Sequence, residues 1–168
     1  MIVLLIDRLG CVNYFIQIAP RLFPIVIEDT YKADHQIQNK KQIKPTVKPC
    51  KIYYNRAEVY IELNKFEEAL KDLEKAISIN KSFSDAYYLI SVIFRTQKKY
   101  KKAIKYLKKV LETNGEDYIA YYDIYKLYNI LIKHEKDETK KEKYLNIANK
   151  SLKKSANLGY EKAINQLK

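Results

Sequence analysis

A period of 34 residues constrains the fold of this chain more than any other feature of its sequence. Shifting the sequence by 34 residues superimposes one aromatic pair in three places, Tyr53-Tyr54 on Tyr87-Tyr88 and on Tyr121-Tyr122. The same shift aligns the positions that follow: Tyr60 with Phe94 and Tyr128, Phe66 with Tyr100, Ala69 with Ala103, Leu73 with Leu107, Ala76 with Val110, and Asn80 with Asn114. A fixed period of about 20 to 50 residues is typical of solenoids, in which each unit buries its apolar face against the next.

Each period reads as two amphipathic helices. Apolar and small residues recur every three or four positions within each half of the unit, which places them on one side of a helix. In the first unit these residues are Tyr53, Ala57, Tyr60 and Leu63, followed by Phe66, Ala69, Leu73 and Ala76. The chain contains three Gly and four Pro, and all the Pro lie within the first 49 residues. Because Gly and Pro are the strongest helix breakers, residues 50–168 are predicted to be all-α.

The order of aromatic, small and bulky residues in this unit resembles the tetratricopeptide repeat. The resemblance implies an α–α superhelix over residues 50–168, built from about three helical hairpins and a C-terminal capping helix. The expected repeats are 50–83, 84–117 and 118–158, and the expected capping helix is 160–167. The pattern departs from the family at the unit ends, where Lys81 and Gly115 replace its frequent proline.

The third unit contains an insertion. It keeps the 34-residue register as far as Leu131 and regains it after 11 extra residues, which aligns Tyr100 with Leu145, Ala103 with Ala148, Leu107 with Leu152, and Val110 with Ser155. Since 11 residues make about three helical turns, both helices can lengthen and remain paired. We expect a long third hairpin with a charged tip at 134–140. The tail at 156–167 is similar to the end of a Sel1-type repeat, and a single capping helix explains it equally well.

Residues 1–49 match no repeat unit. Residues 1–30 form an apolar segment, and residues 31–49 are polar and read as a linker. Asp7 and Arg8 interrupt the first apolar run, which is too short for a signal peptide or a membrane span. The segment fits a strand, a short helix or a membrane-touching stretch, but we expect loose packing or disorder. Two isolated cysteines, Cys11 and Cys50, fit a cytoplasmic protein without a disulfide framework.

The resemblance implies a concave groove lined by the first helix of each unit. First-helix residues that lie off the packing stripe should face this groove, and the candidates are Tyr54, Glu58, Tyr88, Val92, Arg95, Tyr122 and Lys126. Three of them form a ladder of tyrosines, and tyrosine is favoured at binding surfaces. The same rings could instead fill the interface between units. The expected function is a protein–protein interaction scaffold or adaptor that binds a peptide or helix of a partner.

One specific partner is disfavoured by the groove residues. In this family a carboxylate clamp of basic and Asn side chains holds the C-terminal tail of a heat-shock chaperone. The corresponding positions here hold Tyr54, Glu58, Leu89, Ile119 and Asp123, which cannot supply charge-assisted hydrogen bonds to a carboxylate. We therefore do not expect this chain to bind a chaperone tail.

A lysine-rich second helix supports an alternative function. The chain has a formal net charge of +12, and several lysines flank the apolar stripe of the second unit: Lys98, Lys101, Lys102, Lys105, Lys108 and Lys109. Such a surface could bind RNA or an anionic membrane. Nucleic acid is disfavoured because no arginine, glycine or stacking aromatic residue is interspersed for that purpose. Self-association through the first hairpin would follow if the chain were part of a longer array.

Catalysis has no support in the sequence. Three glycines cannot build a phosphate-binding loop, and His35 and His134 lie apart from any nucleophile or metal-ligand pattern. We therefore expect a protein that is not an enzyme and that needs no cofactor or metal.

Overall fold

The computed structural model describes residues 3–6, 12–15 and 48–168 of the chain. By its contacts the chain divides into two units, Met1–Lys48 and Pro49–Lys168. In the first unit, β1 (Val3–Ile6) and β2 (Val12–Phe15) pair antiparallel, with Val3 opposite Phe15 and Ile6 opposite Val12. These two segments therefore form strands, one of the alternatives for the apolar segment, and its loose packing stays a prediction. The rest of the apolar segment and residues 31–47 of the linker lie outside the described residues.

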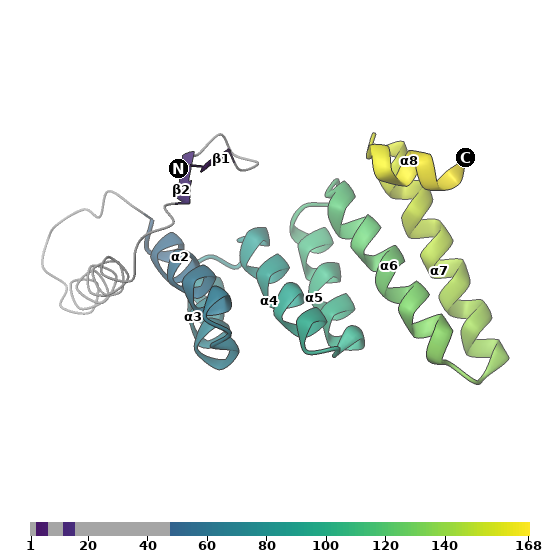
Figure 1. Cartoon of the computed structure of the whole chain (residues 1–168), viewed down its shortest axis with the longest axis horizontal. Helices are drawn as coiled ribbons and strands as arrows, with labels where there is room; N and C mark the ends of the chain where they lie inside the picture. Colours follow the sequence, from purple (N-terminus) through teal and green to yellow (C-terminus); the bar gives the residue numbers. More distant parts are fainter. Residues whose placement is uncertain (1–2, 7–11, 16–47) are drawn as a thin grey trace, which may run out of the picture. The chain divides into compact units, whose positions relative to one another are not determined.

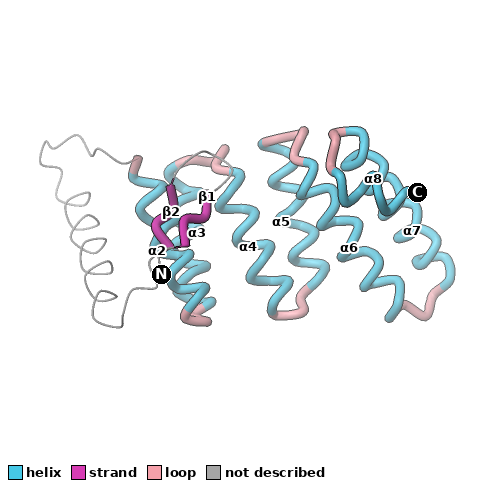
Figure 2. Tube along the Cα trace, turned by 45° about the horizontal axis from the view of Figure 1, so that its top comes forward, coloured by secondary structure: helices cyan, strands magenta, loops and turns pink. Residues whose placement is uncertain are grey.

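The second unit is all-α, as predicted. Its helices are α2 (Pro49–Glu62), α3 (Phe66–Ile79), α4 (Ser84–Thr96), α5 (Tyr100–Thr113), α6 (Tyr118–His134), α7 (Glu138–Asn157) and α8 (Glu161–Leu167). Consecutive helices pack as the hairpins α2/α3, α4/α5 and α6/α7, which follow one another along the unit, and α8 packs against α7 (Figures 1 and 2). The helical unit begins at Pro49, whose fixed φ and missing N–H suit the first helical turn.

Small residues allow the helices of each hairpin to approach closely. The alanines of the predicted stripe are fully buried, including Ala57, Ala69 and Ala103. The core forms two clusters, one around α2, α3 and α4 and the other around α5, α6 and α7. Phe94 packs against both clusters and so joins the second hairpin to its neighbours. A continuous core of this kind is what a stack of hairpins needs for stability.

The third hairpin is longer than the other two, as the insertion predicted. Helix α6 has 17 residues and α7 has 20, whereas α4 has 13 and α5 has 14. The predicted register after the insertion buries Ala148, Leu152 and Ser155. It is wrong for Leu145, which is 47% exposed. Tyr144 packs there instead, with its ring centroid 5.4 Å from that of Tyr128.

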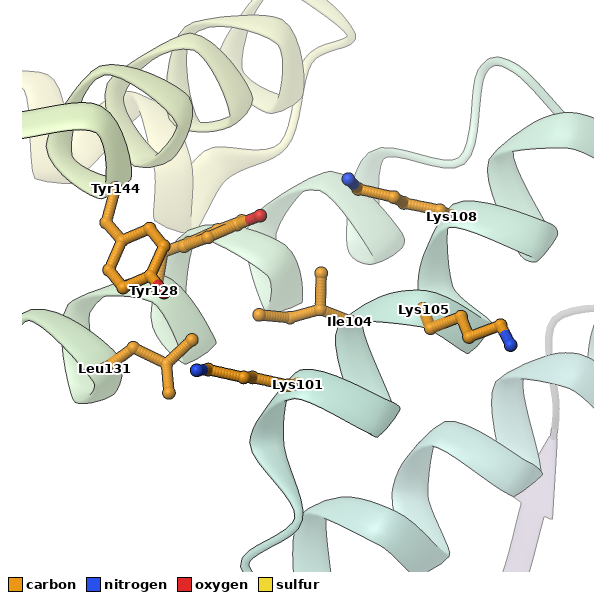
Figure 3. A pocket seen from close by; sticks show the side chains of 7 residues that line it. All are labelled: Lys101, Ile104, Lys105, Lys108, Tyr128, Leu131 and Tyr144. Carbon is orange, nitrogen blue, oxygen red and sulfur yellow. The ribbon is translucent and has the colours of Figure 1, made fainter. Parts of the chain in front are cut away.

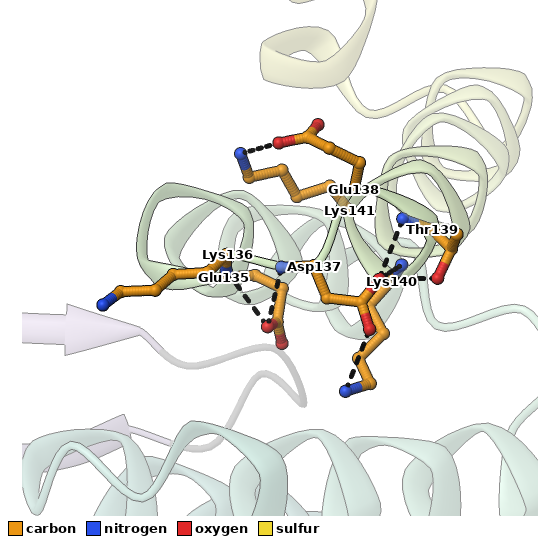
Figure 4. A network of polar contacts seen from close by, with 7 residues as sticks. All are labelled: Glu135, Lys136, Asp137, Glu138, Thr139, Lys140 and Lys141. Atoms are coloured by element: carbon orange, nitrogen blue, oxygen red, sulfur yellow. Dashed lines mark hydrogen bonds and ion pairs between the residues drawn. The ribbon is translucent and has the colours of Figure 1, made fainter.

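At the tip of this hairpin, where α7 begins, side chains and backbone groups form a network of hydrogen bonds and ion pairs (Figure 4). Asp137 is the N-cap, and its Oδ1 accepts from the backbone N–H of Thr139 at 3.0 Å and of Lys140 at 3.2 Å. The Thr139 hydroxyl donates to the same oxygen at 2.6 Å, and Lys140 Nζ lies 3.2 Å from Oδ2. These contacts satisfy backbone donors that the first helical turn otherwise leaves without partners.

We expect the tip to lose stability in acid. The Thr139 hydroxyl, followed by the backbone and side chain of Lys140, lowers the pKa of Asp137 from 3.8 to about 2. A carboxyl group with a lower pKa in the folded state stabilises that state when ionised, so its contribution is complete above about pH 4 and is lost as the pH falls through about 2. An NMR titration should give a midpoint near the lowered pKa of Asp137, and Thr139→Ala should raise it. A wild-type midpoint at the ordinary value would contradict this assignment.

Candidate functional site

The predicted groove residues all lie on the first helix of a hairpin. Tyr54 and Glu58 are on α2, Tyr88, Val92 and Arg95 are on α4, and Tyr122 and Lys126 are on α6. Each of them is at least partly exposed. The structure brings Tyr88, Arg95 and Lys126 together around one further residue, Asp123 of α6.

Asp123 is a buried carboxylate that accepts one hydrogen bond and forms ion pairs with two cations. It is 4% exposed, and its Oδ2 accepts a hydrogen bond from the Tyr88 hydroxyl at 2.8 Å. Its Oδ1 lies 2.6 Å from Lys126 Nζ and 3.7 Å from an Arg95 guanidinium nitrogen. The arrangement therefore ties α4 to α6. We call Tyr88, Arg95, Asp123 and Lys126 the Asp123 cluster.

The cations of the Asp123 cluster remain accessible although the carboxylate is buried. The side chains of Arg95 and Lys126 are 40% and 46% exposed. Two cations and one carboxylate leave a formal charge of +1 at this point of the surface. Asp123 has only two oxygens, which cannot pair with all the N–H donors of these two side chains. The cluster can therefore donate hydrogen bonds to carbonyl or carboxylate oxygens of a ligand.

The three tyrosines of the predicted ladder each pack against another residue. The ring centroid of Tyr54 lies 5.1 Å from that of Phe83, and the Tyr88 hydroxyl is bonded to Asp123. Tyr122 packs on Tyr160, with centroids 5.0 Å apart, and on Tyr125. These contacts fit the alternative that the rings fill interfaces, although the partial exposure of all three also leaves surface for a ligand. Each tyrosine of the ladder therefore takes part in packing or hydrogen bonding and also keeps a partly exposed surface.

Sequence reasoning missed the role of Asp123 as a shared partner. It placed this residue at a position where a chaperone-tail clamp would need a donor, and it did not connect Asp123 with Tyr88. One signal was available, because Asp123 precedes Lys126 by three residues, a spacing at which helical side chains meet. The bond to Tyr88 spans two hairpins, and spacing along one helix cannot reveal it.

The bond between Tyr88 and Asp123 gives a stability prediction. Tyr88→Phe removes the hydroxyl donor and keeps the ring, so we expect the free energy of unfolding to fall by about 1.5 kcal/mol, the lower range for a hydrogen bond to a charged group. Urea denaturation followed by circular dichroism measures this change. Tyr87→Phe is the matched control, and we expect it to change stability by less than about 0.5 kcal/mol. Equal losses in both variants would show that the bond to Asp123 contributes nothing specific.

The lysines of the alternative site are exposed, as expected. Lys98 lies in the turn between α4 and α5, and the other five lie on α5: Lys101, Lys102, Lys105, Lys108 and Lys109. Lys109 forms an ion pair with Glu112 at 2.6 Å. Lys102 lies over the Phe94 ring, 5.5 Å from its centroid. Lys102 and Lys109 therefore differ from the other lysines on α5, because each has a neighbouring group that stabilises its positive charge.

The other three lysines on α5 line an open cavity of about 300 Å³ (Figure 3). The rest of its lining is apolar or aromatic and comes from Ile104 of α5, Tyr128 and Leu131 of α6, and Tyr144 of α7. Burial, and then the nearby Tyr144, raises the pKa of Tyr128. The phenol of Tyr128 is therefore neutral near pH 7. Sequence reasoning had selected these lysines but gave no indication of the cavity.

Neither a metal centre nor a membrane-spanning helix is evident in the described part of the chain. No group of three or more His, Cys, Asp or Glu within residues 3–6, 12–15 and 48–168 is placed to hold a metal ion. No described helix is both long enough and apolar enough to cross a bilayer. The described residues therefore offer no candidate metal site, and the candidate sites remain the Asp123 cluster and the lysines of α5.

Two family models, each described as Tetratricopeptide repeat, match residues 50–83 and 84–117. Residues 50–117 are therefore two tetratricopeptide repeats, which correspond to the hairpins α2/α3 and α4/α5. The matched bounds coincide with those expected from the 34-residue period. Both matches end before α6, so the Sel1-like resemblance of residues 156–167 stays a prediction.

Solved structures share the fold at low sequence identity. MamA has a TM-score of 0.56 and 22% identity, over 68% of this chain and 60% of that chain. YrrB, described as a TPR protein with an unusual peptide-binding site, has a TM-score of 0.56 and 14% identity, over 87% and 68%. The second TPR of Spaghetti (RPAP3), bound to the HSP90 peptide SRMEEVD, has a TM-score of 0.54 and 17% identity, over 72% and 95%. No curated protein matches this chain.

Proposed function

We propose that this chain is a protein–protein interaction scaffold that holds a peptide or helix of a partner protein against α4 and α6. The observation that carries the proposal is the Asp123 cluster. Its buried carboxylate holds two half-exposed cations side by side on the first helices of adjacent hairpins. Preorganised donors of this kind reduce the entropy that a ligand must lose in ordering the site.

The residues near the cluster match the chemistry of a protein segment. Arg95 and Lys126 offer N–H donors to backbone carbonyls and acidic side chains. Val92, on the same helix as Arg95, offers a partly exposed apolar surface. Tyr54 of α2 and Tyr122 of α6 contribute partly exposed rings, and an aromatic ring adds large contact area with few rotatable bonds. A segment with acidic and apolar residues would satisfy both kinds of contact.

The related structures support the class of function. Two tetratricopeptide domains of Spaghetti (RPAP3) were solved with the HSP90 peptide SRMEEVD, and YrrB is described as having an unusual peptide-binding site. Peptide binding is thus a known use of this fold in those proteins. The chaperone tail remains disfavoured for this chain, because Glu58 and Asp123 occupy positions where a terminal carboxylate needs donors.

A peptide-display selection against the full chain tests the proposal. At least one group of the enriched peptides should lose about tenfold or more of its affinity in the variant Arg95→Ala/Lys126→Ala, as expected for central interface cations. The matched control is Lys150→Ala/Lys153→Ala, which removes the same charge from exposed positions on α7. Circular dichroism should confirm that both variants fold. If every enriched peptide bound the groove variant as tightly as the wild type, the groove assignment would be refuted.

The lysines of α5 and its preceding turn support the alternative function, an RNA-binding or membrane-binding surface. Their exposure is the observation in its favour. Phosphate-dominated binding falls steeply as salt increases, whereas a largely apolar peptide contact does not. Binding of RNA that is lost between low and physiological salt would favour this alternative. A cytoplasmic location and the absence of catalytic activity stay predictions from the sequence.

A further inference from the structure

The cavity between α5, α6 and α7 combines a cationic edge with an apolar interior. Lys101, Lys105 and Lys108 follow one another at intervals of four and three residues, so they form a row along one side of α5. Figure 3 shows Lys101 reaching from α5 toward Leu131 of α6, with Ile104 between the side chains of Lys101 and Lys108. The volume of about 300 Å³ is at the lower end of the range for ligand sites, enough for one large side chain.

The insertion in the third hairpin creates this cavity. Leu131 corresponds by the 34-residue period to Gln97, which lies beyond the end of α4. Tyr144 corresponds by the register after the insertion to Lys99, which lies before the start of α5. Two lining residues therefore have no helical counterpart in the second hairpin. The longer α6 and α7 overhang the shorter α5, and the cavity lies at this step in length.

The cationic row has no acidic partner among the described residues. Lys109, Lys126, Lys140 and Lys141 each lie within 3.2 Å of a carboxylate oxygen, and in residues 48–168 the structure records no such contact for Lys101, Lys105 or Lys108. Like charges four residues apart on a helix repel one another. An incoming carboxylate would relieve this repulsion, so the row favours an anionic ligand.

The shape of the cavity distinguishes between anionic ligands. The Tyr128 and Tyr144 rings are inclined at 46° with centroids 5.4 Å apart, so they form no parallel slot for a stacked base. The apolar side chains line a concave cavity, whereas a membrane-binding surface presents apolar side chains outward. An apolar side chain flanked by carboxylates fits both the hollow and the row.

We infer that this cavity is a second docking site, which takes an acidic segment of another protein. One apolar side chain of that segment enters between Ile104, Leu131 and Tyr128. Carboxylates on either side of it contact Lys101, Lys105 and Lys108. The site is independent of the groove, because Tyr128 lies two residues from Lys126 and therefore about 200° around α6 from it.

Fluorescence anisotropy with synthetic probes tests the inference on the full chain. The probe is a labelled peptide of alternating Glu and Ser with one central Phe, and a second peptide replaces the Phe with Ala. The variant is Lys101→Gln/Lys105→Gln/Lys108→Gln, and the matched control is Lys150→Gln/Lys153→Gln/Lys154→Gln, which neutralises three exposed lysines of α7. The Phe peptide should bind wild type and control alike.

The expected result is a loss of about tenfold or more in affinity for the Phe peptide in the cavity variant, and a similar loss for the Ala peptide with wild type. Leu131→Trp, which fills the cavity and keeps every charge, should weaken the Phe peptide and leave the Ala peptide unchanged. Equal binding of the two peptides would overturn the inference. Saturable binding of a single-stranded RNA or of anionic vesicles, lost in the same lysine variant while the Phe peptide fails to bind, would also overturn it. The groove variant Arg95→Ala/Lys126→Ala should bind the Phe peptide normally, so this result and that of the groove test are distinguishable.

Discussion

Replacing Tyr53 with alanine is expected to lower the free energy of unfolding of the helical unit by about 4 kcal/mol, as for a large aromatic side chain in a core. Tyr53 is 1% exposed and is among the largest fully buried side chains of the described residues. Its ring packs within the first core cluster, and the cations of Lys75 and Arg56 lie 4.6 Å and 5.6 Å from its centroid. The substitution therefore removes apolar contacts and two cation–π contacts together.

Thermal and urea denaturation measure this loss, and the neighbouring Tyr54 provides the control. Tyr54→Ala removes the same atoms from a half-buried position, so we expect a clearly smaller loss, about 2 kcal/mol or less. Comparable losses at the two positions would mean that burial of Tyr53 does not dominate the stability of the first hairpin. Because repeats contact only their neighbours, the loss should appear first in α2 and α3 when hydrogen exchange is measured helix by helix.

Replacing Asp72 with alanine is expected to cost about 3 kcal/mol, the lower range for breaking a buried ion pair. Arg56 Nε and Nη2 donate to the two oxygens of Asp72 at 2.6 and 2.7 Å, which joins α2 to α3 by a bidentate pair. The side chains are only 13% and 9% exposed. Without Asp72, the Arg56 guanidinium would remain largely buried and would lose its carboxylate partner.

The second repeat supplies a control for this pair. The 34-residue period places Ile90 and Tyr106 where the first repeat has Arg56 and Asp72. The double variant Arg56→Ile/Asp72→Tyr replaces the ion pair with the two residues of the second repeat. We expect it to be about as stable as the wild type, because apolar replacements of buried ion pairs are often neutral or stabilising. Chemical denaturation of the single and double variants gives both numbers. A double variant as unstable as Asp72→Ala would indicate that the pair itself, and not the isolated charge, determines stability.

The hairpins could be predicted from the sequence because the residues that make the helices pack are close together in the chain and recur in each repeat. A small residue such as Ala69 or Ala103 recurs at each helix crossing, and an aromatic residue such as Tyr60 or Phe94 recurs at each gap between units. The same logic located the buried positions after the insertion, at Ala148 and Leu152. It failed at Leu145 because a longer helix permits the adjacent Tyr144 to supply the aromatic packing.

The polar contacts were not predictable in the same way. Asp72 and Asp123 find their partners on other helices, and the choice of partner depends on crossing geometry that periodicity along one helix does not contain. The groove candidates Tyr88, Arg95 and Lys126 were selected as first-helix residues that lie off the packing stripe, and their role in binding stays a prediction. Only the structure shows that these three side chains contact Asp123. The cavity beside α5 likewise depends on a difference in length between adjacent hairpins.

The long third hairpin is the part of the helical unit in which a new binding specificity can evolve with the least effect on the stability of the other repeats. A solenoid transmits little strain beyond the nearest unit, so residues gained or lost in whole helical turns near the tip leave the preceding repeats intact. Each such change alters how far α6 and α7 extend beyond α5, and it changes which of their residues line the cavity. Variation in the length of this one hairpin would therefore change the cavity while the Asp123 cluster on α4 and α6 stayed constant.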